Sequence, residues 1–236
     1  MRRANDISAT MINLRINVAE SFGADREDIL REAKIDPNIF ANPKSRVTVD
    51  QTMETWKAIA RHTGSEDMGL ESGLKMRMQF MGVLGYVMMN SPSIFKAYEK
   101  YFVHQRLVMS IIFLELIVEN DRVKIEGEMQ VPWIQPYRYT MDFVMAANLS
   151  IIKSSTVKSI HPIKVGFNYP EPDNSIRYHE IFGPAEIEFS SAKPYMLFNK
   201  SDMDEEIIGF NSELFQHFEL KLEDRLKEHV YYCVKH

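Results

Sequence analysis

The chain contains 236 residues, of which 45% are hydrophobic and 26% are charged, a composition that excludes a disordered tail and predicts a folded protein. Its 28 Lys and Arg against 33 Asp and Glu leave a net charge of −5, which disfavours direct binding of nucleic acid by this chain alone. Its single cysteine, Cys233, excludes an intramolecular disulfide, and no signal peptide or membrane-length apolar stretch is visible, so we expect a cytoplasmic protein without membrane contact.

Helical spacing of apolar residues dominates the first part of the chain, from Met11 to Ala60. Side chains that cap helix starts and glycines that end helices separate four such segments. In chain order these boundary residues are the stop Gly23, the caps Asp25 and Asp36, the capping-box pair Thr48 and Gln51, and the stop Gly64. The pattern predicts a helical subdomain over residues 1–75. A plain helical hairpin is favoured over a DNA-reading helix-turn-helix, because the second helix carries as many acids as bases.

Two more helices are predicted to meet at Ser91-Pro92, where the serine has the place of an N-cap and the proline that of a first-turn residue. The period then changes to that of a β-hairpin. Two segments rich in apolar residues, 111–118 and 123–131, flank the turn signal Asn120-Asp121. Gly127, in the second segment, is compatible with a bulge.

A long helix and three short strands follow the hairpin. A further short helix is predicted to end at Phe182-Gly183-Pro184, where we expect glycine to adopt the left-handed conformation. Helices and antiparallel strands are segregated along the chain, which predicts an α+β fold with an amino-terminal helical region followed by an antiparallel sheet with packed helices. The expected ranges are 137–152 for the helix and 163–167, 187–189 and 195–198 for the strands, all within an α+β effector-binding region over 76–212.

Residues 213–236 are predicted to form an amphipathic linker and dimerisation helix. The apolar stripe of this helix can pack either on its own domain or on the same helix of a second subunit. We favour the second arrangement, a homodimer. The stripe residues assigned to dimerisation are Leu214, Phe218, Leu222 and Leu226.

Three separated motifs make most of the chain similar to a known family. They are GVLGYVMMNSP at 82–92, VGFNYPEP at 165–172, and YHEIFG at 178–183 followed by Phe189. Together they resemble the amino-terminal effector domain of AraC/XylS-type bacterial transcription regulators, in the arabinose-binding-like subgroup. The resemblance implies a ligand-sensing, dimerising domain whose small-molecule effector controls attached helix-turn-helix motifs. It also implies that DNA is contacted only through a domain missing from this chain.

Aromatic residues gather where the hairpin passes into the long helix, and we assign the effector site to them and to the first motif. An arginine between aromatic walls suits a carboxylate or a phosphate, and hence an acidic effector, whereas an ordinary surface arginine lying over rings is the alternative. The predicted ligand-binding residues are Tyr86, Trp133, Tyr137, Arg138 and Tyr139. Several methionines either line an adaptable pocket or fill the core, namely Met76, Met78, Met81, Met88 and Met89.

Catalytic motifs are not visible, so we predict no catalytic residue, no enzyme activity and no cofactor. His229, Cys233 and His236 share one helical face without a visible fourth ligand, and we therefore predict no metal site. A stand-alone small-molecule or haem sensor, or an enzyme, stays open as the alternative, with His104 as the axial ligand of a haem.

Overall fold

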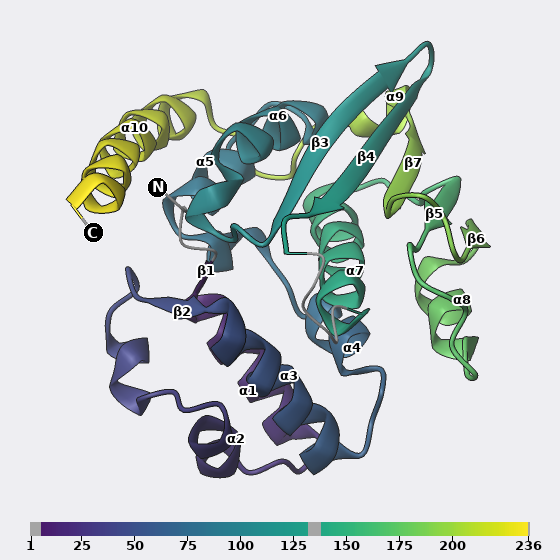
Figure 1. Ribbon diagram of the computed structural model, residues 1–236. Coiled ribbons are helices and arrows are strands. Elements are labelled where there is room, and N and C mark those ends of the chain that lie inside the picture. The colour runs from purple at the N-terminus through teal and green to yellow at the C-terminus, as the bar shows by residue number, and fades with distance from the viewer. Residues whose placement is uncertain (1–5, 132–137, 236) are drawn as a thin grey trace.

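A central helix, α7 (Arg138–Ser155), holds the fold together. The structure is a computed structural model that describes residues 6–131 and 138–235, with side chains described as far as residue 224. Figure 1 shows an amino-terminal helical lobe below α7, a five-stranded sheet on one side of it and a group of helices on the other. Almost every side chain of α7 is buried, so this helix is the centre of the core. The predicted α+β class is confirmed.

Helices of the amino-terminal lobe start and end at the predicted residues. The Asp25 carboxylate accepts a hydrogen bond from the backbone N–H of Asp28 at 3.0 Å. The Thr48 hydroxyl and the Gln51 side chain form the predicted capping box, and Gly64 ends that helix with a φ of 64°. The lobe contains α1 (Ala9–Ser21), α2 (Arg26–Glu32), the 3-10 helix η1 (Pro37–Ala41) and α3 (Val49–Thr63).

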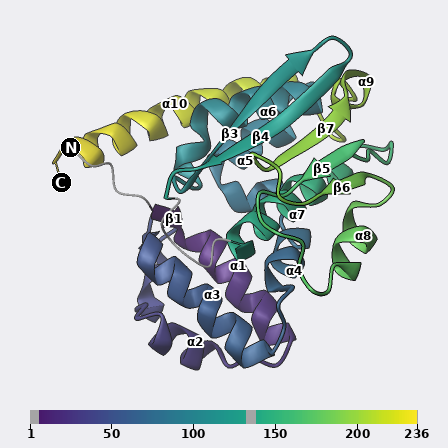
Figure 2. The same cartoon turned by 45° about the vertical axis from the view of Figure 1, so that its right-hand side comes forward.

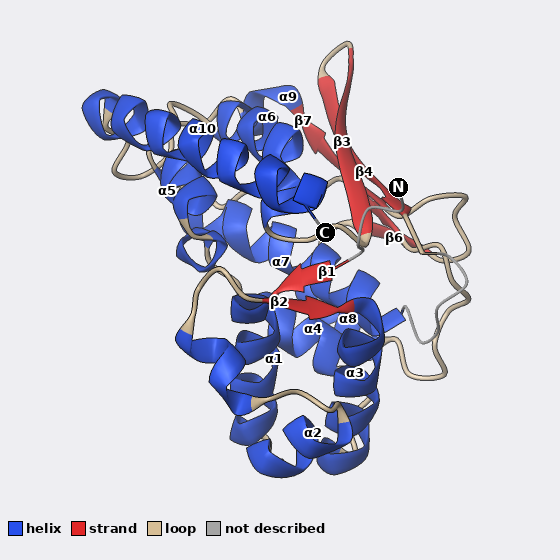
Figure 3. Cartoon of the chain, turned by 60° about the vertical axis from the view of Figure 1, so that its left-hand side comes forward, coloured by secondary structure: helices blue, strands red, loops and turns tan. Residues whose placement is uncertain are grey.

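A two-stranded sheet, which the sequence pattern did not predict, connects this lobe to the remainder of the chain (Figure 3). Its strands β1 (Asp6–Ser8) and β2 (Arg46–Thr48) are antiparallel. The Arg46 guanidinium binds the Asp6 carboxylate at 2.6 Å and the Leu107 carbonyl oxygen at 2.5 Å. One arginine thus joins both strands to the segment that leads into the large sheet.

α4 (Met68–Leu74), also unpredicted, packs directly against α7 through two glycines. A Cβ atom on Gly69 would lie 2.5 Å from the Tyr139 carbonyl oxygen. A Cβ atom on Gly73 would lie 2.6 Å from the Phe143 carbonyl oxygen. Both distances are too short for a real contact, so the packing of α4 on α7 requires glycine at these positions.

Gly85 has the same role in the first motif. It lies in α5 (Val83–Met89), which follows the 3-10 helix η2 (Met78–Met81), and a Cβ atom on it would collide with the carbonyl oxygen of Met78. This motif glycine therefore permits helix packing rather than contact with a ligand.

Two helices meet after the first motif as predicted, but the predicted cap is wrong. The next helix is α6 (Ile94–His104), followed by the 3-10 turn η3 (Gln105–Leu107). Its N-cap is Ser93, whose hydroxyl accepts a hydrogen bond from the backbone N–H of Lys96 at 3.3 Å. Ser91 instead donates back to the Val87 carbonyl oxygen at 2.9 Å, and so completes α5.

Five strands form the large sheet in the order β3-β4-β7-β5-β6. All neighbouring pairs are antiparallel except β5 and β6, which are parallel. Asn120, with a φ of 54°, makes the predicted hairpin turn. The bounds are β3 (Ile112–Glu119), β4 (Arg122–Met129), β5 (Lys164–Gly166), β6 (Glu186–Glu188) and β7 (Tyr195–Asn199).

Two glycines in this half of the chain act differently from the prediction. Gly127 forms no bulge, because it pairs with Leu114 in an uninterrupted register, and its missing side chain leaves room for Leu114 and Pro194. Gly183 follows α8 (Ile176–Phe182) as expected, but its φ of −56° is not left-handed. Glycine is needed there because a Cβ atom would lie 2.7 Å from the His179 carbonyl oxygen.

The chain ends with α9 (Lys200–Met203) and the long helix α10 (Ser212–Lys235), whose far end extends beyond the other elements (Figure 2). α10 packs on α5 of its own domain. Phe218 stacks on Tyr86 with ring centroids 5.0 Å apart, and Leu222 is 2% exposed, whereas Leu214 is 46% exposed. The side chain of Leu226 lies outside the described residues. Among the helices that the structure describes, none has the length and apolar character that crossing a membrane requires.

Candidate functional site

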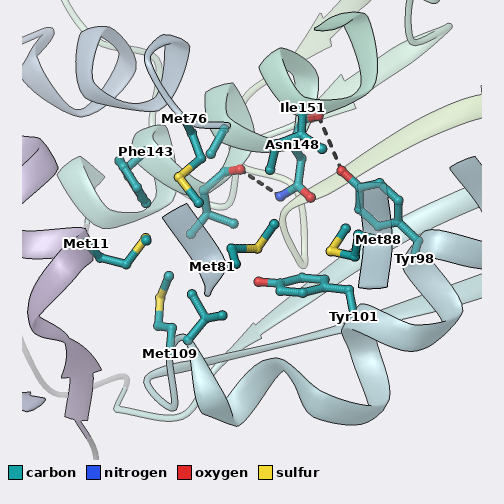
Figure 4. A pocket seen from close by; sticks show the side chains of 13 residues that line it. Met11, Met76, Met81, Met88, Tyr98, Tyr101, Met109, Phe143, Asn148 and Ile151 are labelled. Carbon is teal, nitrogen blue, oxygen red and sulfur yellow. Dashed lines mark hydrogen bonds between the residues drawn. The ribbon is translucent and has the colours of Figure 1, made fainter. Parts of the chain in front are cut away.

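A small cavity lies between α1, η2, α5, α6 and α7, with a free volume of about 30 Å³ (Figure 4). Its wall is mainly apolar, and five of its thirteen residues are methionines. The lining residues are Met11, Met76, Met81, Met88, Tyr98, Tyr101, Val108, Met109, Phe143, Val144, Ala147, Asn148 and Ile151.

The helical period of α7 builds one wall of the cavity. Phe143, Ala147 and Ile151 recur at a spacing of four residues and therefore share one face of the helix. Tyr98 and Tyr101, three residues apart, likewise share one face of α6, which faces this wall. The cavity is thus a gap between helix faces that otherwise form the core.

Few polar groups face this space. The Asn148 side-chain amide donates to the Val144 carbonyl oxygen at 2.7 Å, and the Tyr98 hydroxyl donates to the Asn148 carbonyl oxygen at 3.3 Å. The Tyr101 hydroxyl points into the cavity (Figure 4). Burial raises the pKa of both phenols, so both keep their proton at neutral pH.

These properties define what the cavity can bind. A free volume of about 30 Å³ holds roughly two water molecules, so a larger molecule requires side chains to move. Methionine has three rotatable side-chain bonds and adapts to irregular shapes, which makes such movement inexpensive. The site is suited to an apolar group with one or two hydrogen bonds.

The methionines that the sequence singled out divide into two sets. Met76, Met81 and Met88 line the cavity, whereas Met78 and Met89 do not. The alternative of a haem sensor is not supported by the position of His104, which ends α6 and does not belong to the lining. In the described part of the chain, His, Cys, Asp and Glu form no group of three or more that could hold a metal ion.

None of the predicted ligand-binding residues that are described belongs to the lining of this cavity. Tyr86 is 42% exposed and stacks on α10. Tyr139 stacks on Trp56 with ring centroids 5.9 Å apart. Trp133 and Tyr137 lie outside the described residues. A common site formed by all five stays a prediction.

Arg138 already has acidic partners. Its guanidinium lies 3.3 Å from the Glu66 carboxylate and 3.5 Å from the Asp142 carboxylate. It also donates a hydrogen bond to the Tyr178 hydroxyl at 3.1 Å. A ligand carboxylate would therefore compete with two carboxylates of the protein.

Asp142 is a buried carboxyl group that sequence reasoning missed. Its oxygens accept hydrogen bonds from the hydroxyls of Tyr169 and of Tyr178, the latter at 3.0 Å. Burial raises the pKa of Asp142 to about 7, although both hydrogen bonds and the charge of Arg138 favour its ionised form. Tyr169 and Tyr178 belong to the second and third motifs, so these two motifs meet at α7.

Comparison with known proteins adds a family match. A family model described as the arabinose-binding domain of the AraC transcription regulator, N-terminal, matches residues 23–207. The ornithine utilization regulator of Pseudomonas aeruginosa is 25% identical over 171 residues, which cover 72% of this chain and 50% of that protein. The chain thus spans about half the length of this curated relative.

A solved structure has a similar fold. The crystal structure of the transcriptional regulator CdpR from Pseudomonas aeruginosa superposes with a TM-score of 0.61 and 16% sequence identity. The match covers 87% of this chain and 61% of that chain. At this identity the likeness shows the fold alone.

Proposed function

Because this chain belongs to the family of amino-terminal arabinose-binding domains of AraC-type transcription regulators, we propose that it binds a small-molecule effector in the methionine-lined cavity. The observation that carries this proposal is a cavity inside the core that is lined by adaptable side chains. The domain acts without catalysis, in the cytoplasm, by changing the state of attached helix-turn-helix motifs. The mainly apolar lining favours an effector with an apolar body over a sugar, whose hydroxyls need polar partners.

A contact between two helices offers a route from the cavity to the end of the chain. Met88 lines the cavity and lies in α5. Tyr86, in the same helix, stacks on Phe218 of α10. A ligand that displaces Met88 would act on α5, and through α5 on the helix that leads out of the domain. This arrangement supports sensing by movement of α10.

We expect that filling the cavity weakens the response to effector. Ala147→Leu adds three carbon atoms to the wall of α7, and overpacking of this kind costs about 1–3 kcal/mol. In a transcription reporter driven by the chain joined to its helix-turn-helix domain, compounds active on the wild type should need at least about tenfold higher concentration.

The control is Ser154→Leu, which adds a larger side chain at an exposed position of the same helix. This variant should respond as the wild type does. An unchanged midpoint for Ala147→Leu, with a folded protein, would place the effector site outside the cavity.

We also propose that the domain forms a homodimer through the part of the α10 stripe that its own domain leaves exposed. Leu214 supports this proposal, since its side chain is about half exposed at the start of the helix. Light scattering should give a dimer for the wild type and a monomer for Leu214→Asp, with Glu213→Ala as the control. A wild-type monomer at all concentrations would rule out the homodimer, and a dimer of Leu214→Asp would remove Leu214 from the interface.

A further inference from the structure

Arg15, in α1, is fully buried and has no polar partner. Its relative exposure is 0%, and none of its three guanidinium nitrogens has a hydrogen-bond partner among the described residues. The guanidinium carbon lies 4.5 Å from the ring centroid of Trp56 and 4.5 Å from that of Phe143. The cation lies against two neighbouring aromatic rings, one from α3 and one from α7, whose centroids are 6.3 Å apart.

This environment leaves a positive charge without a counterion. Burial lowers the pKa of Arg15 to about 9, so the guanidinium remains charged at neutral pH. Two cation-π contacts offset part of the cost of burying the charge, but they satisfy none of its N–H groups. The indole N–H of Trp56 is itself engaged, since it donates to the Thr140 hydroxyl at 3.0 Å. The described residues therefore bury the cation completely but provide no anionic group to pair with it.

The unpaired donors are concentrated at this one side chain. Six buried side-chain nitrogen and oxygen atoms lack a partner among the described residues, and three of them belong to Arg15. Another is the hydroxyl oxygen of Ser72 in α4, a helix that packs against α1. Because buried polar groups are almost always hydrogen-bonded, an exception of this size indicates a missing partner.

The guanidinium lies next to the methionine-lined cavity. Met11 lines the cavity and precedes Arg15 by four residues, so both side chains lie on the same face of α1, one turn apart. Phe143 lines the cavity and also packs on the guanidinium. Movement of these two side chains would join the cavity to Arg15.

We propose that Arg15 binds the carboxylate of the effector, whose apolar body occupies the cavity lined by methionines. A carboxylate matches the fork of a guanidinium with two parallel hydrogen bonds, and its single negative charge neutralises one arginine. A phosphate dianion would bring more charge than this site can balance. This inference rests on the proposed function, because it assigns the chemical class of the effector to the same cavity.

Arg15 differs from Arg138 in having no acidic side chain beside its guanidinium among the described residues. Arg138 is partly exposed and already lies beside the carboxylates of Glu66 and Asp142. Arg15 has no acidic partner in the described chain, and its side chain is fully buried against two aromatic rings. A ligand carboxylate would therefore gain more binding free energy at Arg15 than at Arg138, because the effective dielectric constant around Arg15 is low.

The test measures binding of matched acids and amides to the whole chain of 236 residues. The probes are butyrate, octanoate, benzoate and phenylacetate, each paired with the neutral carboxamide of the same skeleton. Binding is measured by calorimetry and by the shift of the thermal unfolding temperature. For the skeletons that fit, we expect the acid to bind at least about tenfold more tightly than its amide, as charge-assisted hydrogen bonds imply.

Arg15→Met removes the charge and keeps an unbranched apolar stem, although the side chain is shorter. We expect this variant to bind each acid and its amide equally, and to unfold in the free state at the same temperature as the wild type or higher, because an unpaired buried charge is gone. Arg15→Gln provides a second neutral variant if Arg15→Met does not fold. An acid preference that persists in a neutral variant would overturn the proposal.

The panel also separates failure of this inference from failure of the proposed function. If acids and amides bind the wild type equally, and Ala147→Leu blocks both, the cavity is a ligand site but Arg15 is not its anion anchor. If no probe binds and Ala147→Leu leaves the reporter response unchanged, both proposals fail. A saturable stabilisation by chloride that equals that by any acid would reduce Arg15 to the site of an inorganic counterion, and would also overturn the inference.

Discussion

Replacing Gly85 by alanine is expected to lower the free energy of unfolding by at least about 3 kcal/mol, at the upper end of the cost of overpacking. The added Cβ atom would collide with the carbonyl oxygen of Met78, which is backbone and cannot rotate away as a side chain can. α5 and η2 would have to separate. Urea unfolding followed by circular dichroism measures the loss.

The control for this variant is Gly23→Ala. Gly23 has a φ of 89° and no atom within 4 Å of the position of its Cβ, so the substitution costs only the strain of the left-handed backbone, about 1–2 kcal/mol. Comparing the two variants separates a collision from backbone strain. A loss for Gly85→Ala no greater than that for Gly23→Ala would show that α5 can shift without cost. Since Met81 and Met88 lie on either side of Gly85, we also expect the cavity to be distorted.

The contribution of Asp142 to stability is expected to decrease as the pH rises from about 4 to about 7. Burial raises the pKa of this carboxyl in the folded chain to about 7, from its ordinary value of 3.8. The folded state therefore holds the proton more tightly than the unfolded state does, and its stabilising effect is lost as pH rises through the folded pKa. The full difference corresponds to an upper limit of about 4 kcal/mol.

Asp142→Asn isolates this contribution. The amide oxygen can still accept a hydrogen bond from Tyr169 or Tyr178, but the side chain no longer titrates. We expect the free energy of unfolding of the variant, measured in urea between pH 4 and pH 8, to depend less steeply on pH. His104, whose pKa is lowered by burial, acts in the opposite direction in both proteins and cancels in the comparison. The exposed Asp173→Asn serves as the control, and an identical slope for Asp142→Asn and the wild type would contradict the assignment.

Helix boundaries in the amino-terminal lobe were predictable because their signals are local. The Thr48 capping box and the Gly64 stop each involve residues within one or two turns of each other, so the sequence contains the whole interaction. β1 and β2 were missed for the opposite reason. Each strand has three residues, too few to show a period, and the ion pair between Asp6 and Arg46 spans 40 residues. α4 was missed because its two interior glycines reduce helical propensity, and packing on α7 compensates for this.

The cavity could not be assembled from the sequence. Met11 and Met109 lie almost a hundred residues apart and meet only through the fold. Arg15 did leave a local signal, since it follows Met11 by four residues and so places a charge on an apolar helix face. The sequence favours Arg138 instead because aromatic residues flank it, but Glu66, its partner in space, lies 72 residues away.

The five methionines of the cavity wall have a consequence for selectivity between related compounds. A wall of branched or aromatic side chains rejects molecules of the wrong outline, whereas unbranched thioethers repack around different outlines at little cost. Shape alone therefore distinguishes poorly among molecules in this cavity. If the cavity holds the effector as we propose, discrimination must come from the few polar groups at its edge. A change of one methionine to a branched residue such as isoleucine should then narrow the range of compounds that bind, without altering the fold.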